Sequence, residues 1–273
     1  MRKLVPLALL LAIACTTATP PAPTTPAAAE DAGPYGMTVE EEAQILAMED
    51  RRAFDPALVS AWMQHANALH RRRLALALGR IGPHTFADTD NDGELDATEH
   101  PAGFLELIAL AKDSDRSVRE TVAFALGEVG DSNASDTLFA LSADNDAAVA
   151  GEAIEALSKL ATNVNWRVAN QARYLWFTNA QWPEGLRARA ARFLFRFDTD
   201  QASETAVRLL SDSSSAVRQE AAYALSRRPF ARAARQLELL MTDANVLTRA
   251  YAIAGIGRVA ETASLPGVIA ALG

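Results

Sequence analysis

The chain has 273 residues, of which 49% are hydrophobic, and its 26 basic and 34 acidic side chains give a formal net charge of −8. A chain of this length and apolar content can bury a substantial core. Its acidic balance offers no general attraction for polyanions, so we do not expect nucleic acid as a partner. The sequence also lacks a nucleophile elbow, a phosphate-binding loop and a paired acid and base. We therefore expect neither enzymatic activity nor a small-molecule substrate.

Residues 1–14 have the features of an export signal. A short basic head, Arg2 and Lys3, precedes an apolar run from Leu4 to Ala14 that is too short to cross a bilayer as a mature helix. The only cysteine of the chain, Cys15, follows the small residues that precede a cleavage site. With a single cysteine, the mature fold forms no internal disulfide.

The sequence Leu11-Ala12-Ile13-Ala14-Cys15 resembles the lipobox of bacterial lipoproteins. In that family the cysteine is acylated, so the resemblance implies a lipid anchor at Cys15, a bacterial cell-envelope location and no other membrane contact. Thr16 follows the cysteine in place of an aspartate, which by the same resemblance favours the outer membrane, with the body in the periplasm or outside. The alternative is ordinary secretory cleavage after Ala14, which leaves a free thiol.

Residues 15–37 are expected to form a linker behind the anchor. The stretch from Thr16 to Pro34 contains five prolines and almost no large apolar side chains, so it cannot collapse into a core. Proline-rich chain rises ~3.1 Å per residue, and this stretch could reach roughly 60 Å. It would hold a folded body away from a lipid surface.

Residues 38–273 are expected to form one helical domain, which begins with a capping-box pattern at Thr38 and Glu41. A thirteen-residue phrase then recurs, with aligned apolar residues at Leu78, Leu126, Leu157, Leu194, Leu225 and Ile256. Subtraction of these positions gives steps of 48, 31, 37, 31 and 31 residues. Self-similarity at a period of about 30 residues indicates a stacked array of one structural unit.

Each unit is predicted to be a helical hairpin. The best copy of the phrase, VRETVAFALGEVG from Val118, places its apolar residues in one stripe of a helix, and Gly127 and Gly130 mark its exit. Shorter apolar stretches that precede the copies begin at Pro56, Gly103, Asp136, Glu204 and Arg235. The sequence thus predicts an all-α fold, an α-solenoid of about six hairpins.

Charged residues recur at fixed positions of the phrase. Five residues before the aligned starts stand Asp113, Asp144, Asp212 and Asp243, and just after the starts stand Arg71, Arg119, Arg187, Arg218 and Arg249. An aspartate there can cap the second helix of a hairpin and accept a hydrogen bond from an arginine alongside. We interpret these residues as a structural ladder, and a groove for acidic peptides is the alternative.

This pattern resembles HEAT repeats, in particular the short bacterial repeats of phycobilisome-lyase type, from about Pro56 to Gly273. The resemblance implies a right-handed solenoid with first helices on the convex side, second helices on the concave side, and a protein or peptide partner on the concave face. The copies from Val149 and Leu186 depart from it. Ala150 replaces the arginine, and the 37-residue step indicates an enlarged unit with irregular stacking.

An insert at residues 83–101 carries the sequence of a calcium loop. It matches the twelve-residue EF-hand loop, whose expected ligands here are Asp88, Asp90, Asp92, Glu94, Asp96 and Glu99, with Gly93 at the sharp turn. No second hand accompanies it, so we expect calcium to act as a structural clip. A solvated acidic loop is the alternative.

Three further groups are candidates for a site. Eight aromatic residues between Trp166 and Phe197 are interpreted as filling the enlarged unit, with a partner-binding patch as the alternative. A basic zone suited to recognition, unless it is a solvated helix face, comprises Arg187, Arg189, Arg192, Arg196, Arg227, Arg228, Arg232 and Arg235. The histidines His65, His70, His84 and His100 lack the spacing of a metal motif and are interpreted as surface or turn residues.

The predicted function is that of a lipid-anchored, extracytoplasmic scaffold that binds a protein or peptide and holds one structural calcium ion. The array also resembles the N-terminal part of bacterial HEAT lipoproteins with a cyclophilin-type peptidyl-prolyl isomerase domain downstream. In that alternative the chain is the non-catalytic portion of a longer enzyme. The final residues ASLPGVIAALG are predicted to be the first helix of a seventh hairpin, with a catalytic domain beyond Gly273.

Overall fold

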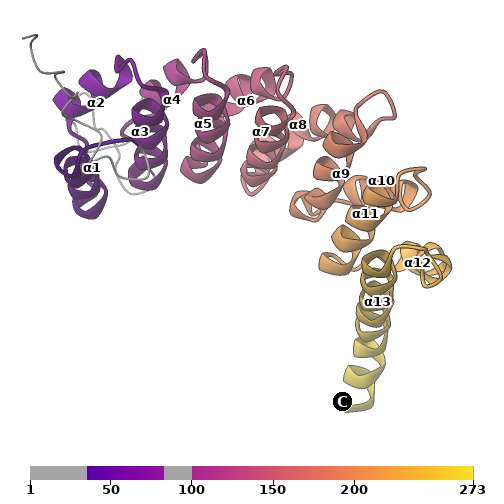
Figure 1. Cartoon of the computed structure of the whole chain (residues 1–273). Coiled ribbons are helices and arrows are strands. Elements are labelled where there is room, and N and C mark those ends of the chain that lie inside the picture. The colour runs from indigo at the N-terminus through magenta and orange to yellow at the C-terminus, as the bar shows by residue number, and fades with distance from the viewer. Residues whose placement is uncertain (1–35, 83–99, 273) are drawn as a thin grey trace, which may run out of the picture.

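The computed structural model describes residues 36–82 and 100–272, with side chains described through residue 260. Every regular element in these two ranges is a helix, and the helices follow one another along a single curved array (Figure 1). The predicted export signal, Cys15, nearly all of the linker and the six calcium ligands lie outside the described residues.

The array consists of α1 (Val39–Arg51) followed by six hairpins of two helices. The first helices of the hairpins are α2 (Pro56–Met63), α4 (Phe104–Leu110), α6 (Ser135–Leu141), α8 (Val164–Leu175), α10 (Asp200–Leu209) and α12 (Ala234–Leu240). The second helices are α3 (Ala68–Ile81), α5 (Arg116–Val129), α7 (Ala147–Leu160), α9 (Glu184–Arg192), α11 (Ser215–Arg227) and α13 (Val246–Leu272). The predicted all-α solenoid of about six hairpins is confirmed.

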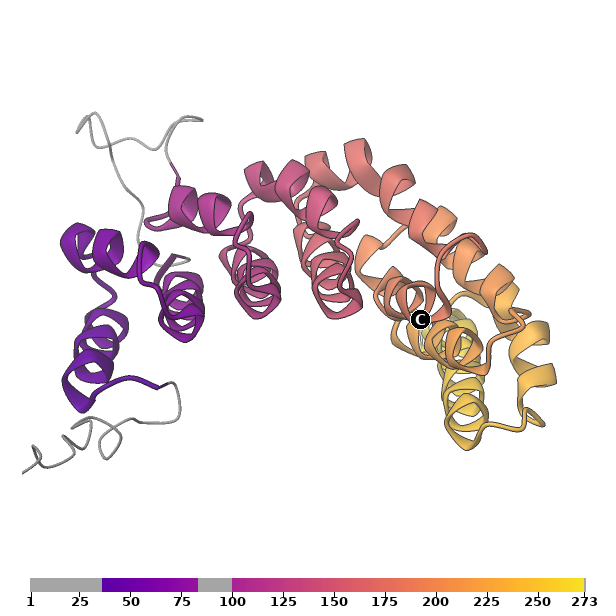
Figure 2. The same cartoon turned by 45° about the horizontal axis from the view of Figure 1, so that its top comes forward.

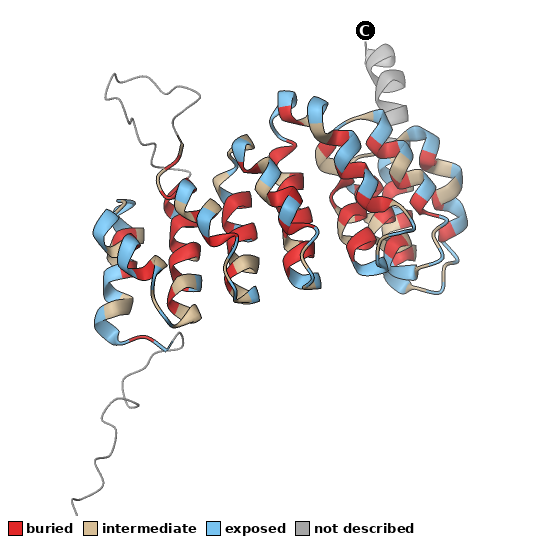
Figure 3. Ribbon diagram, turned by 90° about the horizontal axis from the view of Figure 1, so that it is seen from above, coloured by how far each residue is buried: buried red, intermediate tan, exposed pale blue. Residues whose placement is uncertain are grey.

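The hairpins stack side by side into an open arch. In Figure 1 the second helices line the inner side of the curve and the first helices lie on its outer side, and Figure 2 shows the same layering from another angle. The expected placement of first helices on the convex side and second helices on the concave side is therefore confirmed. Buried residues concentrate where neighbouring hairpins face each other, as in Figure 3, so each hairpin is covered mainly by its neighbours.

The core of the array is built from the apolar stripe of each second helix. In α5, the side chains of Val118, Val122, Ala125 and Leu126 are fully buried between α3 and α7. Burial of one such aliphatic side chain contributes roughly 1.5–3 kcal/mol. The periodic pattern that predicted these helices is thus also the pattern that joins the hairpins.

Two glycines of these stripes have a role that the sequence interpretation missed. A Cβ placed on Gly127 would lie 2.8 Å from Cβ and 3.0 Å from Cα of Ala156, and one placed on Gly79 would lie 2.6 Å from Cβ of Ala125. Gly127 therefore does not mark the exit of its helix but allows α5 and α7 to approach closely. The exit is Gly130, which adopts the left-handed conformation (φ 73°) just after α5.

The helix starts confirm one capping prediction and correct another. At α1, the Thr38 hydroxyl accepts the Glu41 N–H and the Glu41 carboxylate accepts the Thr38 N–H, which is the predicted capping box. The aspartates expected to cap the second helices do not cap them. Asp115 caps α5 instead, and Asp113 accepts the backbone N–H of Asp115 at 2.8 Å. The same arrangement, with Asp144 two residues before the cap Asp146, precedes α7.

The enlarged unit is the fourth hairpin, whose first helix α8 was not predicted. Two of its few aliphatic side chains, Val164 and Val168, are exposed, so α8 shows no aliphatic stripe. Its buried anchors are Trp166 and Tyr174. The second helices α3, α5 and α7 run parallel in Figure 1, and the array turns at this hairpin, as expected from the irregular spacing.

The last helix differs from the prediction. A separate first helix of a seventh hairpin was expected in the final eleven residues, but α13 continues without a break from Val246 to Leu272. Among the described helices, none combines the length and the apolar character needed to cross a membrane.

Candidate functional site

The arginines and aspartates of the predicted ladder form ion pairs. Each pair joins two neighbouring hairpins and does not lie within one turn. The Arg119 guanidinium at the start of α5 donates two hydrogen bonds, of 2.7 and 3.0 Å, to the carboxylate of Asp144 before α7. The corresponding side-chain pairs are Arg71 with Asp113, Arg187 with Asp212 and Arg218 with Asp243. Each arginine thus fastens its own hairpin to the next one.

The same guanidiniums also hold their own turns. Arg119 donates to the carbonyls of Asp113 and Ser114 at 2.8 and 3.1 Å, and Arg218 donates to the carbonyl of Asp212 at 2.9 Å. A planar guanidinium with five donors can serve two turns at once, which a lysine cannot. The interpretation of these residues as a structural ladder is confirmed.

The ladder lowers the pKa of three aspartates, Asp113, Asp144 and Asp243. Hydrogen bonding from Arg119 is the main reason that the pKa of Asp144 lies below its ordinary value, and Arg218 has the same effect on the pKa of Asp243. At Asp113, burial alone would raise the pKa, but the hydrogen bonds from the Arg71 side chain and the Asp115 backbone N–H, with the charge of Arg71, together outweigh it and the pKa is lowered. These carboxylates are therefore held in their charged form.

The inner face of the arch is hollowed near its N-terminal end. A pocket lies across the second helices α3, α5 and α7, lined by Arg72, Arg73, Leu76, Glu120, Thr121, Phe124 and Glu152. Phe124 is one of the exposed large apolar side chains, and burial raises the pKa of Glu152. The pocket thus combines an exposed ring with charged groups on the concave side.

The basic zone predicted for recognition divides into two groups. Most of its members are neutralised by acidic partners: Arg187 by Asp212, Arg189 by Glu155, Arg192 by Glu220, Arg228 by Asp198 and Arg232 by Glu204. Three members, Arg196, Arg227 and Arg235, form no ion pair with any described side chain. The zone is therefore neither a continuous basic patch nor a uniform solvated face.

The aromatic residues of the enlarged unit mainly fill its interior. Trp166, Tyr174, Phe177, Phe193 and Phe197 are buried, and the rings of all but Phe193 contact one another. Trp176 is 48% exposed and Trp182 and Phe195 are partly buried. The packing interpretation is confirmed for the buried rings, and Phe195 remains accessible.

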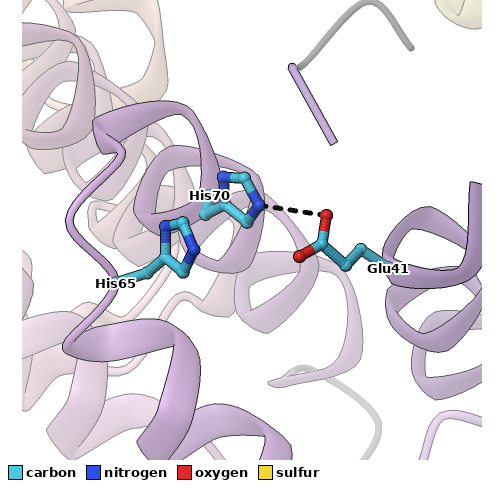
Figure 4. Close-up of side chains that lie close together, drawn as sticks. All are labelled: Glu41, His65 and His70. Carbon is cyan, nitrogen blue, oxygen red and sulfur yellow. Dashed lines mark ion pairs between the residues drawn. The ribbon is translucent and has the colours of Figure 1, made fainter. Parts of the chain in front are cut away.

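A cluster of Glu41, His65 and His70 joins α1 to the start of α3 (Figure 4), with donor atoms that lie within 4.8 Å of one another. His70 is only 3% exposed, so its interpretation as a surface or turn residue is wrong. Its Nε2 lies 3.3 Å from a Glu41 carboxylate oxygen. The ring of His65 stacks on that of His70 with centroids 3.7 Å apart.

The geometry of this cluster suits an electrostatic contact better than a metal site. Nδ1 of His65 accepts the backbone N–H of Asn67 at 3.1 Å, which leaves the ring proton on Nε2. Two imidazoles stacked face to face also cannot both direct an in-plane lone pair at one ion. The cluster therefore connects α1 to α3 through Glu41, whose pKa is lowered first by the Thr38 N–H and further by His70.

Comparisons with known proteins agree with this geometry. The HEAT_2 family model, which describes HEAT repeats, matches residues 104–166. The fold is an α-solenoid of HEAT-like hairpins. No curated protein matches the chain in sequence.

The chain is similar to several solved structures. YibA of Escherichia coli is 18% identical, with a TM-score of 0.53 over 85% of this chain and 80% of that protein. An engineered protein is 19% identical, with a TM-score of 0.47 over 74% of this chain and 95% of its own. A designed armadillo repeat protein in complex with the peptide (KR)4 is 14% identical, with a TM-score of 0.45 over 75% of this chain and 99% of its own. At 18% identity, the similarity to YibA shows the fold alone.

Proposed function

We propose that the chain is a binding scaffold, not an enzyme, and that it takes a protein or peptide along the inner face of its arch. The observation that carries this proposal is the inner face itself, where six second helices lie side by side and charged side chains and Phe124 line a pocket. Solenoids use such extended concave surfaces for binding. Phe124 and the pocket around it add an aromatic anchor of the kind found at binding hot spots.

Position-specific photocrosslinking tests this proposal. A benzoylphenylalanine at Thr121 or Phe124 probes the inner face of α5, and one at Leu105, which is 64% exposed on α4, serves as the matched outer position. In envelope extracts we expect one discrete adduct from the inner positions and none from Leu105. Adducts from the outer position alone, or equal adducts from both, would contradict the proposal.

We also propose that Cys15 carries a lipid and that this anchor is the membrane contact of the protein, with the scaffold outside the cytoplasm. The lipobox-like sequence before Cys15 and the proline-rich stretch after it support this arrangement. Replacing Cys15 with serine should move the chain from the membrane fraction to the soluble fraction. If the variant stays in the membrane fraction, the anchor is elsewhere.

The calcium loop is the third part of the proposal. Six oxygen donors at EF-hand spacing, from Asp88 to Glu99, support a calcium site that stiffens the insert between the first two hairpins. For an extracellular-type affinity near 10⁻⁴ M, millimolar calcium should add about 1–2 kcal/mol to the free energy of unfolding. Thermal melting with calcium and with a chelator measures this gain, and Glu99→Gln should abolish it. An unchanged melting temperature after chelation would rule out the clip.

A further inference from the structure

One position of the repeat carries a row of basic side chains along the array. Two residues after each aligned apolar residue stand Arg80, Glu128, Lys159, Arg196, Arg227 and Arg258, so five of the six are basic. In the N-terminal half the charges are cancelled, because Arg80 pairs with Glu49 at 3.2 Å and Lys159 pairs with Glu128 at 2.6 Å. The C-terminal half is different.

The last three members, which we call the arginine row (Arg196, Arg227 and Arg258), have no carboxylate partner among the described side chains. Arg196 donates to the Ser158 hydroxyl at 2.8 Å, and Arg258 donates to the Ser226 carbonyl at 2.5 Å. Arg227 is exposed, and its guanidinium lies 5.6 Å from the centroid of the Phe195 ring. Within the part of the chain whose side chains are described, no carboxylate neutralises any of these three cations.

Helix-end electrostatics do not account for the whole row. A basic residue in the last turn of a helix is favoured by the helix dipole, and Arg227 ends α11. Arg258, however, lies inside α13, which continues to Leu272. Arg196 lies in a separate 3₁₀ turn (Leu194–Phe197) after α9. The shared feature of the three is their place in the repeat.

Aromatic rings lie beside the arginine row on the same three hairpins. Phe195 contacts Tyr223 edge-to-face at 6.0 Å between centroids, and Tyr223 contacts Tyr251 in the same way at 5.2 Å. Arg192, which is paired with Glu220, lies over the Tyr223 ring at 4.4 Å. The three rings (Phe195, Tyr223 and Tyr251) form a continuous ring platform that is partly open to solvent.

We propose that the arginine row and the ring platform bind an extended acidic peptide, one with a carboxylate at every third residue. Packed neighbouring helices lie about 8–10 Å apart. Extended chain rises about 3.1–3.4 Å per residue, so three residues span about 10 Å. Successive carboxylates of such a peptide meet successive guanidiniums, while its backbone and intervening side chains lie on the rings. Stacking on Phe195 also orients Arg227 before the peptide arrives, which lowers the entropy lost on binding.

This inference rests on the proposed function, since it names the ligand class for one end of the inner face. The photocrosslinking test above concerns the inner face at α5, far along the array from the arginine row. Inner-face adducts without acidic-peptide binding would overturn this inference and leave the scaffold proposal intact.

Fluorescence anisotropy with the full chain tests the inference. The probe is a fluorescein-labelled peptide of four Asp-Pro-Thr triplets, titrated at low and at moderate salt. Three competitors are compared with it: the same composition with the aspartates in one block, four Lys-Pro-Thr triplets, and a single-stranded oligonucleotide. We expect the triplet peptide to bind more tightly than the block peptide, with an affinity that falls as salt rises, and the lysine peptide not to bind.

Charge reversal locates the site. Arg227→Glu should weaken binding by about tenfold, the loss of one charge-assisted contact, and adding Arg258→Glu should weaken it further. Arg235→Glu is the matched control, because Arg235 is an exposed, unpaired arginine of α12 on the outer side. Unchanged melting temperatures show that the variants fold. Binding that tolerates Arg227→Glu, that is equally reduced by Arg235→Glu, or that prefers the oligonucleotide would overturn the inference.

Discussion

Replacing Gly127 with leucine should lower the free energy of unfolding by about 3 kcal/mol, the upper end of the usual cost of overpacking. The reason is the close approach of α5 and α7, where even a Cβ on Gly127 would lie 2.8 Å from Cβ and 3.0 Å from Cα of Ala156. A helix axis must shift to admit a larger side chain, and every later hairpin is stacked on α7. Urea denaturation followed by circular dichroism measures the change.

Comparison of two glycine-to-alanine variants, Gly127→Ala and Gly257→Ala, separates this steric cost from the effect of helix propensity. Glycine to alanine inside a helix normally stabilises by up to about 1 kcal/mol. A Cβ added to Gly257 in α13 would meet no other atom within 4 Å, so Gly257→Ala should be neutral or stabilising. Gly127→Ala should be destabilising despite the same gain in propensity. If both alanine variants are equally stable, the close approach does not constrain the array.

Removing the Arg119 side chain should cost about 2–3 kcal/mol of unfolding free energy, because it leaves a largely buried carboxylate without its cation and two carbonyls without their side-chain donor. The Arg119→Ala variant loses the two bonds to Asp144 and the bonds to the carbonyls of Asp113 and Ser114. Arg119→Lys should recover only part of the loss, since an ammonium cannot form the same fork. Arg116→Ala is the control, because Arg116 is 62% exposed and its pair with Asp146 spans 3.5 Å.

The pH dependence of the Arg119→Ala effect provides a second readout. Arg119 lowers the pKa of Asp144 in the folded state, so the pair stabilises the fold above the ordinary aspartate pKa. The stabilisation is lost as the pH falls through the lowered pKa. The difference between the native chain and Arg119→Ala should therefore shrink as the pH falls below the ordinary aspartate pKa of about 3.9. If the difference in unfolding free energy stays constant as the solution is acidified, the lost contacts are not electrostatic.

The sequence predicted the hairpins that carry an aliphatic stripe, because a helix buried on one face must repeat its apolar residues at helical spacing. It missed α8, whose large buried side chains are the aromatic Trp166 and Tyr174 and whose valines are exposed. It also expected α13 to end early, although the last helix continues to Leu272. Periodicity shows which face is buried but gives little information about where a helix stops.

The ladder residues were predicted, but their partners were not. From sequence spacing, Arg119 was expected near Asp113, the aspartate of its own turn. In the structure its guanidinium donates two hydrogen bonds to Asp144 of the next hairpin. A contact between neighbouring repeats depends on how the units stack, and one copy of a motif does not contain that information. The arginine row could have been found from sequence, by adding two residues to each aligned apolar position. Which of its charges are free could not, because that depends on partners such as Glu49 and Glu128.

The inner face of the arch is the ligand-binding surface that we propose, and hydrogen exchange of the full chain with and without the Asp-Pro-Thr peptide tests this most directly. We expect slower exchange at the C-terminal turn of α11, at the 3₁₀ turn after α9 and around Arg258 in α13, with the outer helices α10 and α12 unchanged. Protection confined to α10 and α12 would contradict the account.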